Sequence, residues 1–107
     1  MPKKRTSQGG SIETRYVTLE AISTRTGVTT RRVRYLERAG LIRPAESDEH
    51  FRLYHEETVE RIQTIERLTN DLGVNLAGVE VILNMREQII ALRARAGLPV
   101  ERPGERT

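Results

Sequence analysis

Three arginines and one tyrosine share a face of a short predicted helix, and their side chains suit a polyanionic ligand. Over residues 30–39, the i, i+3, i+4, i+7 positions of a helix are Arg31, Arg34, Tyr35 and Arg38. Val33 and Leu36 fall on the opposite side, where they would anchor the helix on a core. A guanidinium binds phosphate or donates two hydrogen bonds to guanine, so such a helix suits the major groove of DNA. A solvated arginine face would give the same pattern, so the neighbouring segments must distinguish the two.

The positive charge of the chain is concentrated in the same stretch. Residues 25–43 contain six arginines and one acid, Glu37, for a net charge of +5. Residues 1–24 carry +2 and residues 44–107 carry −4, which leaves the 107-residue chain at +3. A basic segment in an otherwise acidic chain indicates a surface that binds a polyanion.

The segment before the arginine helix predicts a helix-turn-helix. Residues 16–17 could form a very short strand, and Thr18 could then cap a first helix at its N-terminus. Gly27 would end that helix, and Thr29 or Thr30 would cap the second helix. Two short helices joined by Gly-Val-Thr-Thr are typical of a helix-turn-helix, and its second helix is the one that reads DNA.

The segment after the arginine helix predicts a β-hairpin wing. Leu41–Pro44 is expected to be its first strand, and His50–Tyr54 alternates in the manner of a second strand. One assignment of this alternation turns Phe51 and Leu53 toward the core and Arg52 and Tyr54 toward a ligand. The pattern also allows the reverse assignment.

Two further helices are predicted beyond the wing. Glu56 and Glu57 would open the third helix, which keeps an apolar rhythm until Gly73 ends it. Asn75 is a strong N-cap for the last helix, which we expect to run to about residue 96.

The last helix has more apolar surface than a domain of this size can cover. One stripe follows the 3-4-3-4 spacing of a coiled-coil seam and consists of Ile82, Met85, Ile89 and Leu92. A second apolar face, Leu76, Val79 and Leu83, could pack on the rest of the domain. We therefore expect the seam to bind a second copy of the chain by two-fold symmetry, although the helix could instead fold back as core.

These elements give a mainly α fold, a winged helix-turn-helix with a small β-hairpin wing and a C-terminal dimerisation helix. Its DNA-binding domain is expected over residues 15–74 and the dimerisation helix over residues 75–97. A disordered basic arm would precede them over residues 1–14, and a disordered tail would follow over residues 98–107.

Composition excludes several other classes of function. The chain has no Cys, so disulfides, thiolate metal sites and thiol redox chemistry are excluded. Neither His50 nor His55 has a set of metal ligands around it, and we expect no metal and no cofactor. With no Ser/His/Asp or Cys/His set and no glycine-rich phosphate loop, we do not expect an enzyme. No stretch is apolar enough to span a bilayer and no signal core is present, so we expect a cytoplasmic protein.

The arginine helix and the wing carry a family resemblance. The run Val33–Pro44, followed by Phe51–Tyr54, resembles the MerR family of winged-helix regulators. That family's pattern is an Arg-aromatic-Tyr-Glu helix, then Gly-Leu, a wing with a proline, and Tyr-Arg-x-Tyr. The resemblance covers roughly residues 16–94. Two positions depart from the pattern: Leu36 stands where the family usually has Tyr, and His55 stands where a Ser or Thr cap is common.

The stretch Asp71–Val79 is most similar to the heat-shock repressor (HspR-like) branch of that family. This resemblance implies a repressor of heat-shock or chaperone genes, acting as a homodimer on an inverted repeat of double-stranded DNA, with a chaperone as a candidate co-repressor. The family's C-terminal sensor domain has no counterpart here, which favours repression over activation. The same stretch is also similar to chaperone-modulator (CbpM-like) proteins, which bind a co-chaperone. A phage or transposon accessory protein that bends DNA is a further alternative.

The resemblance and the helical wheel together assign the residues that would touch DNA. The family pattern implies helix contacts by Arg34 and Tyr35 and wing contacts by Arg52 and Tyr54. The wheel adds Arg31 and Arg38, with Arg32 at the edge of the face. Thr18 or Thr30, with the backbone N–H groups of the helix starts, could hold further phosphates. We expect Arg31 or Arg34 to read base edges, and Tyr35, Arg38 and Tyr54 to hold phosphates, with Arg52 reaching phosphate or the minor groove.

Overall fold

The structure is a computed structural model that describes residues 15–99 of the chain. It divides into two compact units, one that runs to Ile65 and one that starts at Glu66. The predicted arm over residues 1–14 and most of the predicted tail lie outside the described residues. Within the described range, no helix has both the length and the apolar character that a membrane span requires.

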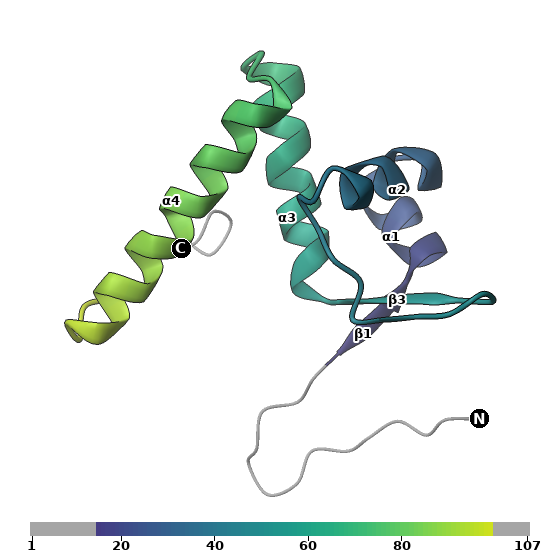
Figure 1. The fold of residues 1–107 in the computed structure, drawn as a ribbon, viewed down its shortest axis with the longest axis horizontal. Helices are drawn as coiled ribbons and strands as arrows, with labels where there is room; N and C mark the ends of the chain where they lie inside the picture. The colour runs from purple at the N-terminus through teal and green to yellow at the C-terminus, as the bar shows by residue number, and fades with distance from the viewer. Residues whose placement is uncertain (1–14, 100–107) are drawn as a thin grey trace, which may run out of the picture. The chain divides into compact units, whose positions relative to one another are not determined.

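The first unit contains a three-stranded antiparallel sheet of short strands. The strands are β1 (Tyr16–Thr18), β2 (Glu46–Ser47) and β3 (Arg52–His55), in the order β1-β3-β2 (Figure 1). Val17 pairs with Tyr54 in one half of the sheet, and Ser47 pairs with Arg52 in the other. β3 is therefore the central strand, and it joins the hairpin wing to the start of the chain.

The first strand of the wing was predicted too early in the sequence. Leu41–Pro44 is not a strand, and the strand that pairs with β3 is Glu46–Ser47. Leu41 and Ile42 are instead buried core residues. Their backbone continues the end of the arginine helix, where the N–H of Leu41 donates to the carbonyl of Leu36 at 3.0 Å.

The helix-turn-helix consists of α1 (Leu19–Thr26) and α2 (Thr30–Arg38), which lie side by side in Figure 1. Thr18 caps α1 as predicted, since its Oγ1 accepts a hydrogen bond from the N–H of Ala21 at 3.1 Å. Thr29 rather than Thr30 caps α2, because its Oγ1 accepts from the N–H of Arg32 at 3.0 Å. Each cap satisfies one of the N–H groups that a helix start leaves without an intrahelical partner.

A glycine in the left-handed conformation ends α2. Gly40 has φ 83°, and its N–H donates to the carbonyl of Glu37 at 3.0 Å. Together with the Leu41 to Leu36 bond, this is the Schellman arrangement, which also brings two apolar side chains into contact distance of the core. The predicted terminator is thus confirmed, and it turns the chain inward.

The fully buried side chains of the first unit come from every one of its helices and from β3. They are Ile22, Val33, Leu36, Tyr54, Ile62 and Ile65. Val33 and Leu36 lie on the inner face of α2, as the wheel predicted. Leu36, the departure from the resemblance noted above, is therefore a packing residue, and its lack of an aromatic ring concerns the core rather than the exposed face of α2.

The third helix is regular for its first ten residues and then changes type. α3 covers Glu57–Glu66, and the π-helix η1 continues it over Arg67–Asp71. The N–H of Leu72 donates to the carbonyl of Arg67, five residues back. The wider turn shifts the apolar rhythm, so Val59, Ile62 and Ile65 are buried whereas Leu72 is exposed.

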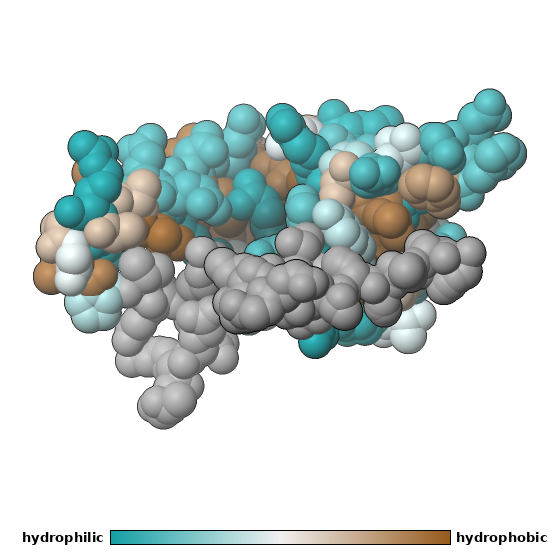
Figure 2. All heavy atoms as spheres, turned by 90° about the horizontal axis from the view of Figure 1, so that it is seen from below, coloured by the Kyte–Doolittle hydropathy of each residue, from teal (hydrophilic) through white to brown (hydrophobic). Residues whose placement is uncertain are grey.

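The second unit is dominated by α4 (Leu76–Arg95). The predicted cap is confirmed, since Asn75 Oδ1 accepts from the N–H of Gly78 at 2.8 Å. Val79 and Leu83 are buried, whereas several large apolar side chains further along α4 are exposed. Figure 2 shows such apolar atoms, in brown, reaching the surface among hydrophilic ones.

Candidate nucleic-acid interface

The outer face of α2 presents cations and one phenol to solvent. Arg31 and Arg38 are exposed, and so is Tyr35, while Val33 and Leu36 on the inner face are fully buried. Within residues 15–99, neither Arg31 nor Arg38 forms an ion pair with an acid. The two guanidiniums are therefore available for a polyanion in the way that the sequence predicted.

Arg32 lies over the ring of Tyr35 rather than standing alone at the edge of the face. Its guanidinium carbon is 5.6 Å from the ring centroid, within the range of a cation–π interaction. The contact holds the Tyr35 ring on the helix surface, where its hydroxyl can donate to phosphate. Arg32 thus orients a predicted contact residue in addition to adding charge.

One carboxylate on α2, that of Glu37, accepts hydrogen bonds from two side chains of β3. Glu37 Oε1 accepts hydrogen bonds from Arg52 Nε at 3.1 Å and from the Tyr54 hydroxyl at 2.8 Å. Glu37 Oε2 accepts from Arg52 Nη2 at 2.7 Å. We refer to Glu37, Arg52 and Tyr54 as the Glu37 cluster. It connects α2 directly to β3 of the wing.

The cluster has clear consequences for the charges of its members. Hydrogen bonds from Arg52, and then from Tyr54, lower the pKa of Glu37, although partial burial opposes the shift. The same pairing raises the pKa of Arg52. Burial, and then the bond to Glu37, raises the pKa of Tyr54 to about 12. At neutral pH the cluster is therefore an ion pair with a neutral phenol donating to its carboxylate.

The predicted role of Tyr54 is wrong. Tyr54 has 0% of its surface exposed, so its hydroxyl cannot reach a phosphate. Phe51 is 47% exposed, so of the two assignments that the alternation allowed, the one with Phe51 on the core side does not hold. The strand does alternate, but the face that carries Arg52 and Tyr54 is the one that turns inward. It does so because Glu37 accepts hydrogen bonds from both side chains.

The contact of Arg52 with phosphate or the minor groove stays a prediction, and the structure shows that this side chain already has a partner. Its side chain is only 22% exposed, and two of its donors bind Glu37 in a fork. A guanidinium so engaged has its charge compensated before any DNA arrives.

Arg34 lies between the exposed side chains of α2 and the Glu37 cluster. Its Nε is 3.9 Å from Glu37 Oε1 and has no hydrogen-bond partner in the part of the chain that the structure describes. The side chain as a whole is 41% exposed, while Nε itself is buried. The atoms that Arg34 offers to a ligand therefore belong to the rest of the side chain, which keeps it a candidate for base contact.

The two predicted threonines lie at the helix starts. The Thr18 hydroxyl accepts from the α1 backbone, and Thr30 is the exposed first residue of α2. A hollow of about 220 Å³ adjoins Thr18, Arg34 and Arg52. Its other lining includes Glu20 and the acids of the wing, so its electrostatic character is mixed.

A second ion pair removes one arginine from the predicted basic surface. Arg25 donates from Nη1 and Nη2 to the two carboxylate oxygens of Glu56, at 3.2 Å and 2.5 Å. The bond from Arg25 lowers the pKa of Glu56, and the same bond raises that of Arg25. Arg25 therefore ties the end of α1 to the start of α3 instead of adding to the DNA-facing charge.

Sequence reasoning missed the roles of Glu37, Glu56 and Arg61. Glu37 gave a signal, since it is the only acid among residues 25–43 and its surroundings are basic. Glu56 gave none beyond its place at a helix start. Arg61 Nε donates to the carbonyl of Leu41 at 2.7 Å, a contact between distant segments that no local pattern reveals.

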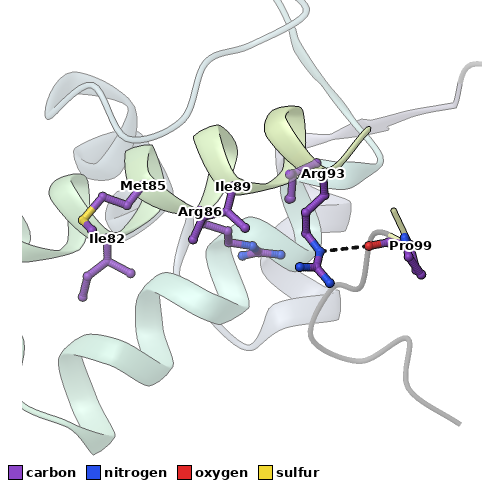
Figure 3. A pocket seen from close by; sticks show the side chains of 7 residues that line it. Ile82, Met85, Arg86, Ile89, Arg93 and Pro99 are labelled. Carbon is purple, nitrogen blue, oxygen red and sulfur yellow. Dashed lines mark hydrogen bonds between the residues drawn. The ribbon is translucent and has the colours of Figure 1, made fainter. Parts of the chain in front are cut away.

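The predicted seam residues share an exposed strip of α4. Ile82, Met85, Ile89 and Leu92 are between 38% and 58% exposed in the single chain. A hollow of about 600 Å³ runs beside three of them and is also lined by Arg86, Ile90, Arg93 and Pro99 (Figure 3). Arg93 Nε donates to the carbonyl of Pro99 at 3.0 Å, which holds the end of the described chain at this hollow.

Comparison with known proteins finds relatives over the same region. Residues 17–86 match the family model described as MerR HTH family regulatory protein. The chain is 31% identical over 70 residues to a Streptomyces coelicolor protein that carries the name heat shock protein HspR. The aligned region is 65% of this chain and 46% of that protein, so the chain spans about half the length of the curated relative it matches.

Proposed function

The chain belongs to the MerR helix-turn-helix family of regulatory proteins, and from this premise we propose that it represses heat-shock or chaperone genes as a homodimer on an inverted repeat. Membership makes it a DNA-binding transcriptional regulator. The target genes, the repression and the dimeric operator are parts of the proposal.

One observation carries the DNA-binding face of the proposal. α2 is anchored by fully buried Val33 and Leu36 and presents Arg31 and Arg38 to solvent with no acidic partner among residues 15–99. An arginine face exposed only to solvent would show the same division, so the place of α2 as the second helix of the helix-turn-helix decides between the two interpretations. In a helix-turn-helix, the second helix places such side chains in the major groove.

We assign base reading to Arg31 and Arg34, and phosphate contacts to Tyr35 and Arg38. Arg32 supports Tyr35, and Thr18 and Thr30 lie where the N–H groups of α1 and α2 can hold phosphates. Tyr54 has no part in this assignment, since it is buried.

The homodimer is supported by the exposed strip of α4. Full burial of a large apolar side chain contributes about 1.5–3 kcal/mol, and the four in this strip are already about half buried, so association gains about half of that for each, against costs of about 4–15 kcal/mol. Burial on both copies of a two-fold interface doubles the favourable sum, which makes a stable dimer reasonable. Two identical reading helices then match two half-sites of opposite orientation.

Heat-shock genes enter the proposal through the relative named HspR, with which the chain shares 31% identity over 70 residues. Repression is the simpler mode, because an occupied operator blocks transcription without any further domain.

The test is a binding measurement with selected DNA. Fragments of the source genome that the full chain retains are sequenced, and the best fragment is titrated by fluorescence anisotropy beside a random duplex of equal length. We expect binding that weakens steeply with salt, with Arg31→Ala costing about 1–3 kcal/mol on the selected fragment. Arg38→Ala should weaken both duplexes similarly and reduce the magnitude of the salt slope by about 1.

Arg95→Ala is the matched control, because Arg95 is an exposed arginine at the end of α4 in the other unit. It should leave the selectivity between the two duplexes unchanged. Absence of salt-dependent DNA binding by the wild-type chain, together with binding to a co-chaperone, would favour the chaperone-modulator alternative and end the proposal.

A further inference from the structure

We propose that Glu37 is a positioning residue for DNA recognition, whose carboxylate fixes Arg52 of the wing against α2 and orients Arg34, so that neither guanidinium binds phosphate without regard to sequence. The inference rests on the proposed function and concerns the same surface. In it, Glu37 increases the selectivity of that surface for its cognate DNA.

The geometry of the Glu37 cluster gives the carboxylate little freedom. Both oxygens of Glu37 are used by the fork of Arg52, and Oε1 is shared with the Tyr54 hydroxyl. Tyr54 is itself immobile in the core, since none of its surface is exposed. The third contact therefore stops the ion pair from swinging outward, which exposed pairs of long side chains commonly do.

The cluster also sets the position of the wing. Glu37 is on α2 and Arg52 and Tyr54 are on β3, 15 and 17 residues further along the chain. Their bonds hold the central strand of the sheet against the reading helix. Because a helix in the major groove must be placed to within a fraction of a base-pair step, a rigid support beside α2 helps base readout.

Charge around the wing argues against a phosphate role for Arg52. Glu46, Asp48 and Glu49 are exposed on the hairpin that carries Arg52. Among the described residues of this hairpin, from Ala45 to His55, Arg52 is the only arginine or lysine, and its charge is compensated by Glu37. A phosphate approaching this side meets three acids that form no ion pair among residues 15–99, whereas the exposed arginines of α2 attract it.

The same carboxylate limits the freedom of Arg34. Its Nε faces Glu37 at 3.9 Å, three residues away on the same helix, while the rest of the side chain is partly exposed. A guanidinium held at one end presents its remaining donors in a restricted set of directions. Restricted donors favour the planar, two-bond contact with guanine over a contact with any nearby phosphate.

The deciding experiment compares Glu37→Gln with the wild-type chain on the selected fragment and on a random duplex. Glutamine has nearly the same shape as glutamate but carries no charge, so it cannot form an ion pair with Arg52 or Arg34. Both guanidiniums then lose their counter-charge. Binding to the random duplex should tighten, and its salt slope should steepen by about 0.9 for each arginine that gains a phosphate. Selectivity, the ratio of the two affinities, should fall by about tenfold or more, which is 1.4 kcal/mol.

Glu20→Gln is the matched control for the change in net charge. Glu20 is an exposed acid of α1 that lines the hollow beside Arg34, and it is not a member of the cluster. It should alter both affinities slightly and equally. If Glu37→Gln loses binding to both duplexes equally and keeps the wild-type salt slope, Glu37 serves only stability and the inference is wrong. The inference is also wrong if Glu37→Gln and Glu20→Gln give the same result.

Two further variants extend the test, and the one that retains Glu37, Arg52→Gln, keeps it decisive if Glu37→Gln does not fold. Arg52→Gln alone should leave the salt slope on the random duplex unchanged, because Arg52 is not a phosphate contact; a slope smaller in magnitude by about 0.9 would contradict the inference. The double variant Glu37→Gln with Arg52→Gln should have a less steep salt slope on the random duplex than Glu37→Gln alone, because Arg52 no longer contributes a phosphate contact. If the wild-type chain selects no fragment at all, the proposed function fails rather than this inference.

Discussion

Tyr54 shows how one residue can carry chemistry that its position in a wing would not suggest. Its ring is in the core, its hydroxyl donates to Glu37 at 2.8 Å, and burial raises its pKa to about 12. The hydroxyl therefore makes its hydrogen bond within the protein rather than to a ligand. Its contribution belongs to stability and to the position of Glu37.

Removal of that hydroxyl should destabilise the fold without unfolding it. In Tyr54→Phe we expect the free energy of unfolding to fall by about 1.5–3 kcal/mol, as for a hydrogen bond to a charged group. Since the pKa of Tyr54 is raised in the folded state, its contribution is complete below pH 10, the ordinary value for Tyr, and is lost as pH rises toward about 12. Urea unfolding at several pH values measures both effects.

Tyr35→Phe is the control for this prediction, because Tyr35 is exposed and the variant keeps the ring beneath Arg32. Its free energy of unfolding should match the wild-type value. A stability difference between wild type and Tyr54→Phe that persists undiminished up to pH 12 would contradict the assigned role.

The inward turn of Tyr54 shows where sequence reasoning stops at the residue scale. Alternation in a strand defines two faces, but it does not say which of them is buried when both carry amphipathic side chains. Phe51 looked like the core residue, and only the presence of Glu37 on α2 makes the opposite choice favourable. That information is non-local, and a helical wheel cannot supply it.

At the scale of elements, the caps determine where the reading helix begins. Thr29 supplies the hydrogen bond to the N–H of Arg32, and Thr30 is the first residue of the helix. Either threonine fits the sequence as a cap, and the structure chooses between them.

The two neighbouring threonines provide a matched test. We expect Thr29→Ala to lower the free energy of unfolding by about 1 kcal/mol, because an N–H of the first turn loses its partner. Thr30→Ala should change it by only a few tenths of a kcal/mol, since alanine favours the helix interior. Thermal or urea unfolding of both variants measures the difference, and equal effects would mean that Thr29 is not the cap.

Helices whose ends are marked by a capping residue or a terminating glycine were predicted well. Elements without such residues at their ends were predicted poorly. The N-caps Thr18 and Asn75 and the terminator Gly40 gave the helices their bounds, and all three are confirmed. The hairpin strands are two and four residues long, too short for a period of two to be distinctive. The π-helix after α3 was also missed, because its extra residue per turn disrupts the apolar rhythm without a residue type that marks it.

At the scale of the whole molecule, the chain was identified correctly as a MerR-type winged helix-turn-helix, with family-model agreement over residues 17–86. The DNA contacts and the dimer seam stay predictions. The exposed strip of α4 leaves four large apolar side chains on the surface of the single chain, which a monomer of this size would ordinarily avoid.

A charge in the centre of this strip should prevent association. Ile89→Asp is expected to sediment as a monomer where the wild-type chain sediments as a dimer, because a carboxylate cannot be buried in an apolar seam without a partner. Loss of the dimer should also cost most of the affinity for an inverted repeat, since two half-sites no longer bind together. Sedimentation equilibrium gives the first result, and anisotropy gives the second.

Ala91→Asp is the control, because Ala91 is exposed on α4 two residues away and lies off the seam. It introduces the same charge and a larger loss of helix propensity, yet it should leave the dimer intact. If both variants dimerise like the wild-type chain, the interface lies elsewhere.

The Glu37 cluster also limits how this sequence can change in evolution. Loss of the acid alone leaves Arg52 without its counter-charge, and loss of Arg52 alone leaves a carboxylate that is only 14% exposed without its main donor. Each single step is therefore unfavourable, while an exchange of both residues is not. We therefore expect positions 37 and 52 to change together among related sequences, so that a substitution at one position accompanies a substitution at the other.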